Sequence, residues 1–242
     1  MNEVVLEVSQ LTKGYKTQNV LKDMSFSLEE GTAAALAGPV GAGKSTLIRI
    51  LAGLEVPEAG SVSLFGSANE KELCRARRET GFVLETPFGY ENLTVLRNLV
   101  HRASLYGRPD MARIKELRKE MRLTERDHVG VKEKLRLLSL GAEKRYSLAC
   151  ALMPKPRLLI LDEPLTGIDR ENRSFLTDQL IRLREEGVTL LISGQSAAEL
   201  QTICTSALLL EEGVLRGPVP MEEAVKEEEA EEAKEAKEEE EA

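Results

Sequence analysis

Nine consecutive residues have the types and the spacing of a phosphate-binding loop. They are Gly38, Pro39, Val40, Gly41, Ala42, Gly43, Lys44, Ser45 and Thr46, and they fit the pattern G-x-x-x-x-G-K-[ST] at every fixed position. Glycines without a Cβ let the backbone curl tightly and direct its N–H groups at phosphate oxygens. The lysine adds a positive charge for the β- and γ-phosphates, and the serine hydroxyl can ligate Mg²⁺. The segment therefore predicts a nucleotide site.

The flanking segments predict the strand and the helix that such a loop needs. Residues 32–37 can form a buried strand before it, although their alanines are weak strand formers. After the loop, apolar residues recur at helical spacing over 47–51, and Gly53 can end the helix. The loop would then open a helix, whose positive N-terminal end favours a bound anion.

A second element of interest is a short apolar run that ends in two acids. Residues 158–161 are followed by Asp162 and Glu163. This pattern is typical of a buried strand that delivers carboxylates to the carboxyl edge of a parallel sheet, where open α/β folds bind ligands. We expect Asp162 to hold Mg²⁺ and Glu163 to accept a proton from an attacking water. The alternative is a strand that simply surfaces in an acidic turn.

Three further positions allow a structural or a functional interpretation. Tyr15 follows a predicted strand over 4–8, and it is either a half-buried strand residue or a stacking surface for a base. Ser139 can cap the helix that follows it, and Gly141 would let a partner approach closely. Residues 81–85 predict another core strand, which ends on the carboxylate of Glu85.

Composition divides the chain into a nearly neutral domain and an acidic tail. Residues 222–242 hold 12 Glu and 3 Lys, so that the other residues keep 29 of the 41 acids and 30 of the 33 bases. We expect one domain over 1–221, with a helical subdomain inserted at about 86–153. The absence of a basic stripe argues against nucleic acid as a partner. The Glu/Ala/Lys tail predicts a solvated helix or disorder, and we expect it to bury nothing.

The sequence also predicts a cytosolic protein. Its three cysteines include no C-x-x-C pair and are typical of buried thiols in a reducing compartment. Residues 1–10 lack a signal-peptide pattern, and no stretch approaches 18 uninterrupted apolar residues. Any role at a membrane would therefore come through a partner.

Together these motifs resemble the ATP-binding cassette ATPases that power ABC transporters, over about residues 4–217. The resemblance implies that Tyr15 stacks on adenine and that Gly38 to Thr46 bind the phosphates of ATP. It also implies an Mg²⁺-linked Asp162, a general base at Glu163, and a loop over 164–169 that touches a second subunit. Residues 138–142 stand where the family places its LSGGQ signature, in which Ser139 and Gly141 contact the partner's nucleotide.

Four positions depart from the family pattern. Glu85 replaces a glutamine that links Mg²⁺ and water to the helical subdomain; a carboxylate can ligate the cation but cannot donate an amide hydrogen bond. Leu140 and Ala142 replace a glycine and a glutamine of the signature. Glu85-Thr86-Pro87 with Ser139-Leu140-Gly141 resembles the bacitracin- and lantibiotic-resistance branch, where these residues are ordinary.

The remaining departure concerns catalysis. The family places a histidine after the last core strand, where it contacts the γ-phosphate and the attacking water, and here that residue is Gln195. A glutamine amide can hydrogen-bond the γ-phosphate but neither carries charge nor shuttles a proton. Losing one such electrostatic contact typically costs about 10²–10³ in rate. Because Glu163 is intact, we expect hydrolysis that is weakened but retained.

The resemblance implies an α/β fold with a mainly parallel P-loop core, an antiparallel N-terminal β-subdomain and the helical insertion. By the family's mechanism, two identical or different subunits enclose two MgATP molecules. They drive a separate membrane-spanning permease from the cytoplasmic face, in contact with residues 85–92. We expect the ATPase of an exporter of antimicrobial peptides or other drugs. The alternatives are a regulatory subunit with little hydrolysis and, less favoured, a soluble ABC protein acting on DNA or ribosomes.

Overall fold

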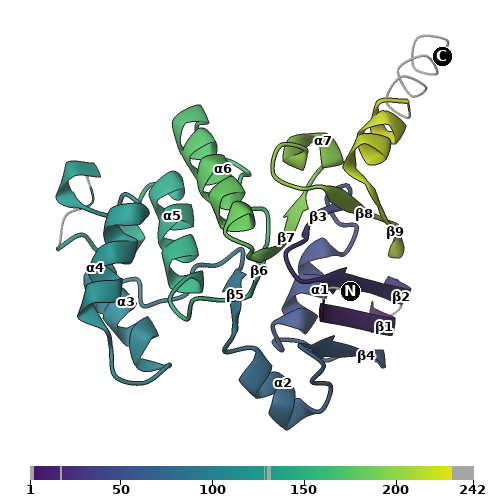
Figure 1. Cartoon of the computed structure of the whole chain (residues 1–242), viewed down its shortest axis with the longest axis horizontal. Coiled ribbons are helices and arrows are strands. Elements are labelled where there is room, and N and C mark those ends of the chain that lie inside the picture. The colour runs from purple at the N-terminus through teal and green to yellow at the C-terminus, as the bar shows by residue number, and fades with distance from the viewer. Residues whose placement is uncertain (1–2, 17, 128, 130–131, 231–242) are drawn as a thin grey trace.

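Two sheets organise the computed structural model, which describes residues 3–16, 18–127, 129 and 132–230 (Figure 1). The smaller sheet is antiparallel, with strand order β2-β1-β4; its strands are β1 (Val4–Tyr15), β2 (Gln18–Glu29) and β4 (Ala59–Leu64). The larger sheet has the order β5-β6-β7-β3-β8-β9. Its strands are β5 (Thr80–Val83), β6 (Leu158–Leu161), β7 (Thr189–Gly194), β3 (Ala33–Ala37), β8 (Ser206–Glu211) and β9 (Val214–Pro220). Only the pairing of β8 with β9 is antiparallel in this sheet, so the predicted fold class is confirmed.

Helices cover the sheets on both sides. They are α1 (Lys44–Leu51), α2 (Glu70–Ala76), α3 (Val95–Ser104), α4 (Met111–Glu120), α5 (Leu140–Ala151), α6 (Arg170–Glu185) and α7 (Ala197–Leu200), with short 3-10 turns at Glu125–Asp127 and Leu135–Leu137. The helices α3, α4 and α5 form the insertion between β5 and β6, and they lie at the opposite end of the molecule from the antiparallel sheet (Figure 1). Among the described residues, none of the helices combines the length and hydropathy needed to cross a bilayer.

The central strand β3 separates two hydrophobic cores. Ala34 and Leu36 face α1 and the antiparallel sheet, whereas the alternate alanines of β3 face the helices on the other side. All five residues of β3 are buried, and the strand pairs with β7 on one side and β8 on the other. Tertiary burial between two neighbours therefore outweighs the weak strand propensity of alanine.

The parallel register brings four loops to one edge of the sheet. Val83 pairs with Leu161, Leu161 pairs with Ile192, and Ala37 pairs with Gly194. Because parallel strands end in step here, the segments after β3, β5, β6 and β7 emerge side by side. These four segments are the phosphate loop after β3 and the segments that carry Glu85, Asp162 and Gln195 after β5, β6 and β7.

Several predicted boundaries were wrong. β5 ends at Val83, so Glu85 lies two residues beyond the strand. The first strand continues to Tyr15 through register shifts, because β2 pairs with it as far as Tyr15 and β4 as far as Thr12. The sequence analysis also missed α2, whose Asn69 cap accepts a hydrogen bond from the Glu72 N–H.

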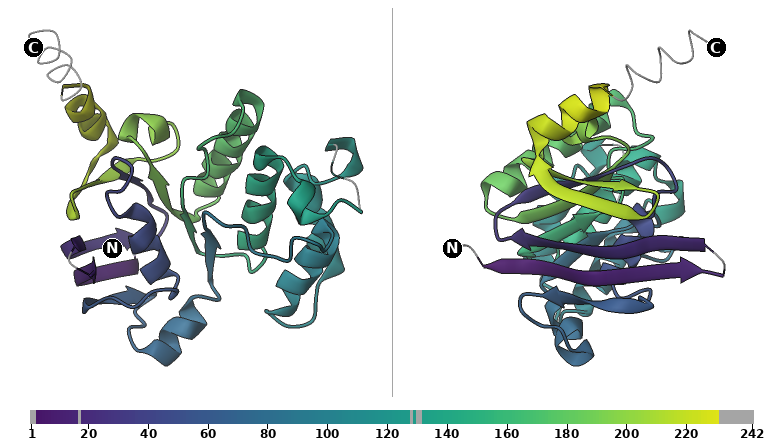
Figure 2. Two further views of the ribbon diagram at one scale, coloured as in Figure 1. Left: turned by 180° about the vertical axis from the view of Figure 1, so that it is seen from behind. Right: turned by 90° about the vertical axis from the view of Figure 1, so that its right-hand side faces the viewer.

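The expectation that the acidic tail buries nothing was wrong for its first part. Residues 221–230 are helical and lie beside α7 (Figures 1 and 2). Met221 and Ala224 are 6% and 0% exposed and belong to the core, and Val225 packs against it. These residues recur at helical spacing within an otherwise charged run, so one face is apolar enough to dock. Residues 231–242, the rest of the predicted tail, lie outside the described residues.

Candidate nucleotide-binding site

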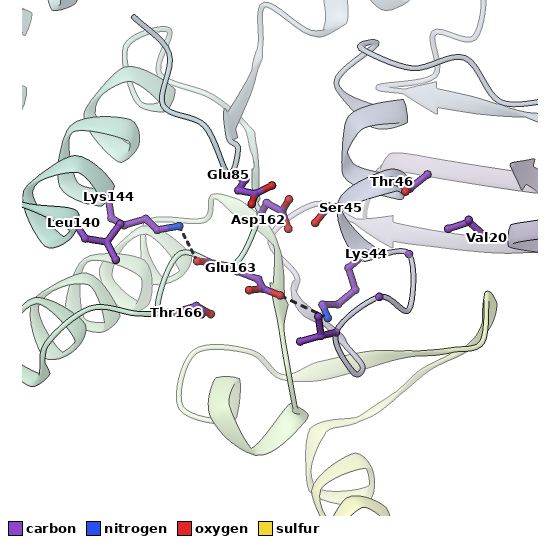
Figure 3. Close-up of a pocket in the computed structure, with 13 residues that line it drawn as sticks. Val20, Lys44, Ser45, Thr46, Glu85, Leu140, Lys144, Asp162, Glu163 and Thr166 are labelled. Carbon is purple, nitrogen blue, oxygen red and sulfur yellow. Dashed lines mark hydrogen bonds and ion pairs between the residues drawn. The ribbon is translucent and has the colours of Figure 1, made fainter. Parts of the chain in front are cut away.

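A cavity of about 450 Å³ lies where the phosphate loop meets the ends of β5 and β6. The phosphate loop supplies one wall of it, and the opposite wall comes from the acidic strand end and α5 (Figure 3). The lining residues are Val20, Val40, Gly41, Gly43, Lys44, Ser45, Thr46, Glu85, Leu140, Lys144, Asp162, Glu163 and Thr166. The cavity thus brings together most of the residues that the two sequence motifs predicted.

The phosphate loop has the conformation that its glycines allow. Gly41 and Gly43 have φ angles of 86° and 111°, in the region that favours glycine. Lys44 is 4% exposed, and its Nζ donates hydrogen bonds to the carbonyl oxygens of Gly38 at 2.6 Å and Pro39 at 2.9 Å. The Lys44 ammonium also lies 3.6 Å from Oε1 of Glu163. A buried cation therefore stands within the curl of the loop.

The two acids after β6 are held by one hydroxyl from β7. Oγ of Ser193 donates to Oδ1 of Asp162 at 2.8 Å and accepts a hydrogen bond from the Glu163 N–H at 2.9 Å. Glu163 has a φ angle of 44°, a left-handed conformation that costs energy in a residue with a Cβ. The sequence analysis did not single out Ser193, although a polar residue ending an apolar strand was an available signal.

The predicted Mg²⁺ ligands line the same cavity. Glu85 and Asp162 point toward Ser45, the second residue of α1 (Figure 3). Mg²⁺ in nucleotide sites is usually held by one or two carboxylates together with waters and phosphates, so this hydroxyl and two carboxylates fit the ion. The part of the chain that the structure describes contains no cluster of three or more His, Cys, Asp or Glu side chains that could hold a metal ion. Glu85 additionally pairs with Arg49 of α1 at 3.6 Å.

Lys144 is a functional candidate that the sequence analysis missed. Its Nζ donates a hydrogen bond of 3.0 Å to the carbonyl oxygen of Glu163, which ties α5 to the acidic strand end (Figure 3). Burial lowers the pKa of the Lys144 ammonium, while the nearby carboxylates of Asp162 and Glu163 oppose that shift. Leu140 and Lys144 lie four residues apart on one face of α5, and this spacing was the available signal.

We expect Lys144→Met to lower ATP turnover about 10-fold, because the backbone of Glu163 loses the hydrogen bond that ties it to a side chain of α5. The methionine keeps the length and the apolar stem of lysine but has no ammonium. Steady-state hydrolysis would be compared with that of Lys115→Met, which alters an exposed lysine of α4. Equal turnover in the two variants would contradict a role for Lys144 at Glu163.

Other predicted site residues lie outside this cavity. Tyr15 is 43% exposed, and its hydroxyl donates to a carboxylate oxygen of Glu55, a contact that raises the pKa of the phenol. Ser139 caps α5 as predicted, with its Oγ accepting from the Ala142 N–H at 3.3 Å. Gln195 lines a separate cavity with Gly38 and Pro39.

Gly141 is buried against its own chain. A Cβ at this position would lie 2.4 Å from the side chain of Asn172 on α6. The glycine is therefore required for the packing of α5 on α6, in addition to any approach by a partner. We expect Gly141→Ala to destabilise the protein by about 1–3 kcal/mol, and Gly141→Ala with Asn172→Ala to recover most of that loss. Chemical denaturation would measure both, and additive losses would contradict this explanation.

Comparison with known proteins identifies the family. The family model described as "ABC transporter" matches residues 21–166, which include both halves of the cavity. The chain belongs to the ABC transporter family. It is 32% identical over 223 residues to the uncharacterized ABC transporter ATP-binding protein YdbJ of Bacillus subtilis, covering 92% of this chain and 71% of that protein. It is also 32% identical to the linearmycin resistance ATP-binding protein LnrL of Bacillus subtilis, over 86% of this chain and 67% of that protein.

A solved ABC cassette supports the same assignment. The dimeric post-hydrolysis structure of the ATP-binding cassette MJ0796, bound to ADP and Pi, aligns with a TM-score of 0.78 and 25% identity. The alignment covers 89% of this chain and 98% of that chain. The chain is thus an ATP-binding subunit of an ABC transporter, and its fold is that of ABC ATPases.

Proposed function

We propose that this subunit binds and hydrolyses MgATP to energise an exporter of antimicrobial peptides or other drugs. The observation that carries the proposal is the single cavity in which Lys44 and Ser45 face Asp162 and Glu163. A cation, a hydroxyl and two carboxylates from separate elements are what phosphoryl transfer to water requires. The relative LnrL is a linearmycin resistance ATP-binding protein, which supports an exporter for this class of cargo.

In the proposed reaction, this chain mainly positions groups and stabilises charge. Lys44 exchanges the carbonyls of Gly38 and Pro39 for phosphate oxygens, because its ammonium already lies within the loop. Glu163 accepts the proton of the attacking water, and the hydrogen bond from its N–H to Oγ of Ser193 fixes the direction of its backbone. Ser45, Asp162 and Glu85 would hold Mg²⁺, which neutralises charge on the phosphates when bound.

The proposal includes partners that complete the site. Two subunits, identical or different, would enclose two nucleotides, each between one phosphate loop and the other subunit's 138–142 segment. The dimeric assembly of the MJ0796 cassette supports this arrangement. The exposed face of the insertion near Phe88 and Tyr90, which are 37% and 56% exposed, would meet a membrane-spanning permease at the cytoplasmic side.

A second candidate function is a regulatory subunit with little hydrolysis of its own. Gln195 favours it, because this residue lines the cavity behind the phosphate loop and does not line the cavity that contains Glu163. A neutral amide at that position cannot supply the charge of a protonated histidine. The rate of ATP hydrolysis by the isolated subunit therefore distinguishes a hydrolysing subunit from a regulatory one.

Steady-state MgATP hydrolysis, measured on the purified native protein and on the Gln195→His variant, decides between the hydrolysing and the regulatory subunit. We expect measurable turnover in the native protein. In Gln195→His we expect turnover to rise about 10-fold or more, which is less than the full effect of a single electrostatic contact on the rate in other enzymes. ATP binding would be measured separately by calorimetry. Binding without turnover would establish the regulatory alternative, and no binding at all would overturn both functions.

A further inference from the structure

The acidic C-terminal segment forms one wall of a second cavity, of about 280 Å³, behind the phosphate loop. Gly38, Pro39 and Gln195 line one side of this cavity, and Glu227 and Glu228 line another. Gly38 and Pro39 are the residues whose carbonyl oxygens bind the ammonium of Lys44. The segment therefore reaches the back of the nucleotide site although it lies far from it in sequence.

Glu228 contacts the backbone directly after Gln195. Its Oε1 accepts a hydrogen bond of 2.6 Å from the Ala197 N–H, and its Oε2 accepts one of 3.1 Å from the Ala198 N–H. Both N–H groups open α7, which spans only four residues and leaves most of its donors without partners inside the helix. A charged carboxylate that accepts two such bonds holds the segment more firmly than neutral contacts would.

The position of Glu228 is fixed by contacts on its own helix. Ala224 lies one turn before Glu228 and is fully buried, and Met221 is buried a further turn back. Glu227 forms a 2.7 Å ion pair with Arg216 of β9. With these anchors, the carboxylate of Glu228 is held against α7 at little further cost in side-chain entropy.

The 195–199 segment also contacts the rest of the chain away from Glu228: Glu199 forms an ion pair with Arg173 of α6, and Ala197 is fully buried in the core. The Gln195 N–H donates to Oε2 of Glu199 at 3.3 Å, and Oγ of Ser196 accepts from the Glu199 N–H, also at 3.3 Å. These two bonds are internal to 195–199, so they do not themselves tie Gln195 or Ser196 to another element. The two hydrogen bonds that Glu228 accepts join the 195–199 segment to the C-terminal helix.

We propose that Glu228 is a positioning residue for ATP turnover, which holds the 195–198 segment so that Gln195 stays beside the phosphate loop. This inference rests on the proposed hydrolysis of ATP. It assigns the beginning of the acidic tail a role in setting the catalytic rate, by holding Gln195 against the Gly38 and Pro39 side of the phosphate loop.

Hydrogen exchange tests the contact without depending on ATP. We expect the amides of Ala197 and Ala198 to exchange about 10-fold faster or more in Glu228→Ala, because each loses a charge-assisted acceptor. Glu229→Ala is the matched control, since Glu229 is exposed, has the same charge and forms no hydrogen bond or ion pair with the described part of the chain. Glu228→Gln keeps one acceptor oxygen and should lie between the two. Unchanged exchange in Glu228→Ala would overturn the contact.

Kinetics test the consequence. We expect Glu228→Ala to lower kcat about 10-fold with KM for ATP changed less than about 2-fold, because the segment holds Gln195 beside the phosphate loop and does not bind adenine. Adding Glu228→Ala to Gln195→Ala should then have no further effect. Equal kcat in Glu228→Ala and Glu229→Ala, an increase in kcat, or additive losses in the double variant would each overturn the proposal. Failure of the proposed function itself would show differently, as no turnover in the native protein while the exchange effect remains.

Discussion

Replacing Glu163 with glutamine is expected to reduce ATP hydrolysis by about 10²–10⁴-fold, the usual contribution of a general base. Glutamine has nearly the same shape but cannot accept the proton of an attacking water at neutral pH. The backbone at this position would be unchanged, because the Glu163 N–H and carbonyl oxygen are held by Ser193 and Lys144 through atoms that the substitution does not alter.

ATP binding by Glu163→Gln is the internal control. The loss of the 3.6 Å ion pair should leave Lys44 free to bind phosphate oxygens, so that the dissociation constant for MgATP stays equal or falls. Calorimetric titration and phosphate release would be measured on the same preparation. Turnover in Glu163→Gln within about 10-fold of the native rate would assign the proton transfer to another group.

The parts of the site that are contiguous in sequence could be predicted from sequence. The phosphate loop and the pair Asp162-Glu163 each lie in one short segment, and the types of residue at fixed spacing encode their geometry. The sequence also predicted that these two segments lie near each other, since parallel strands bring their carboxyl ends to one edge of the sheet. Both segments line the same cavity.

Contacts between distant elements could not be predicted. The bond from Lys144 to Glu163 depends on how α5 packs beside the end of β6. The separation of Gln195 from the catalytic cavity depends on the path of the chain after β7. Neither packing arrangement is specified by local periodicity.

The C-terminal helix shows why composition alone misled. A Glu/Ala/Lys run is typical of a solvated segment, but Ala224 is fully buried and belongs to the core. Charged residues one turn away then acquire partners such as the amides of Ala197 and Ala198. Small residues at helical spacing in a charged run can therefore indicate docking.

Two alanine substitutions in the phosphate loop are expected to differ sharply. A Cβ on Gly38 would lie 2.1 Å from the carbonyl oxygen of Leu210, which belongs to the backbone of β8 and cannot rotate away. We expect Gly38→Ala to lower the free energy of unfolding by about 3 kcal/mol or more and to abolish MgATP binding, since the loop must shift from the carbonyl geometry around Lys44.

Gly41→Ala is the matched comparison within the same loop. A Cβ on Gly41 would meet no atom within 4 Å, so only its φ of 86° opposes the substitution. The expected loss is about 1–2 kcal/mol, the cost of a left-handed conformation in a residue with a Cβ. Chemical denaturation and nucleotide titration of both variants would measure the difference. Equal stability of the two would mean that close approach to β8 does not determine the residue at position 38, whereas a larger loss in Gly38→Ala ties the phosphate loop to the sheet that supports it.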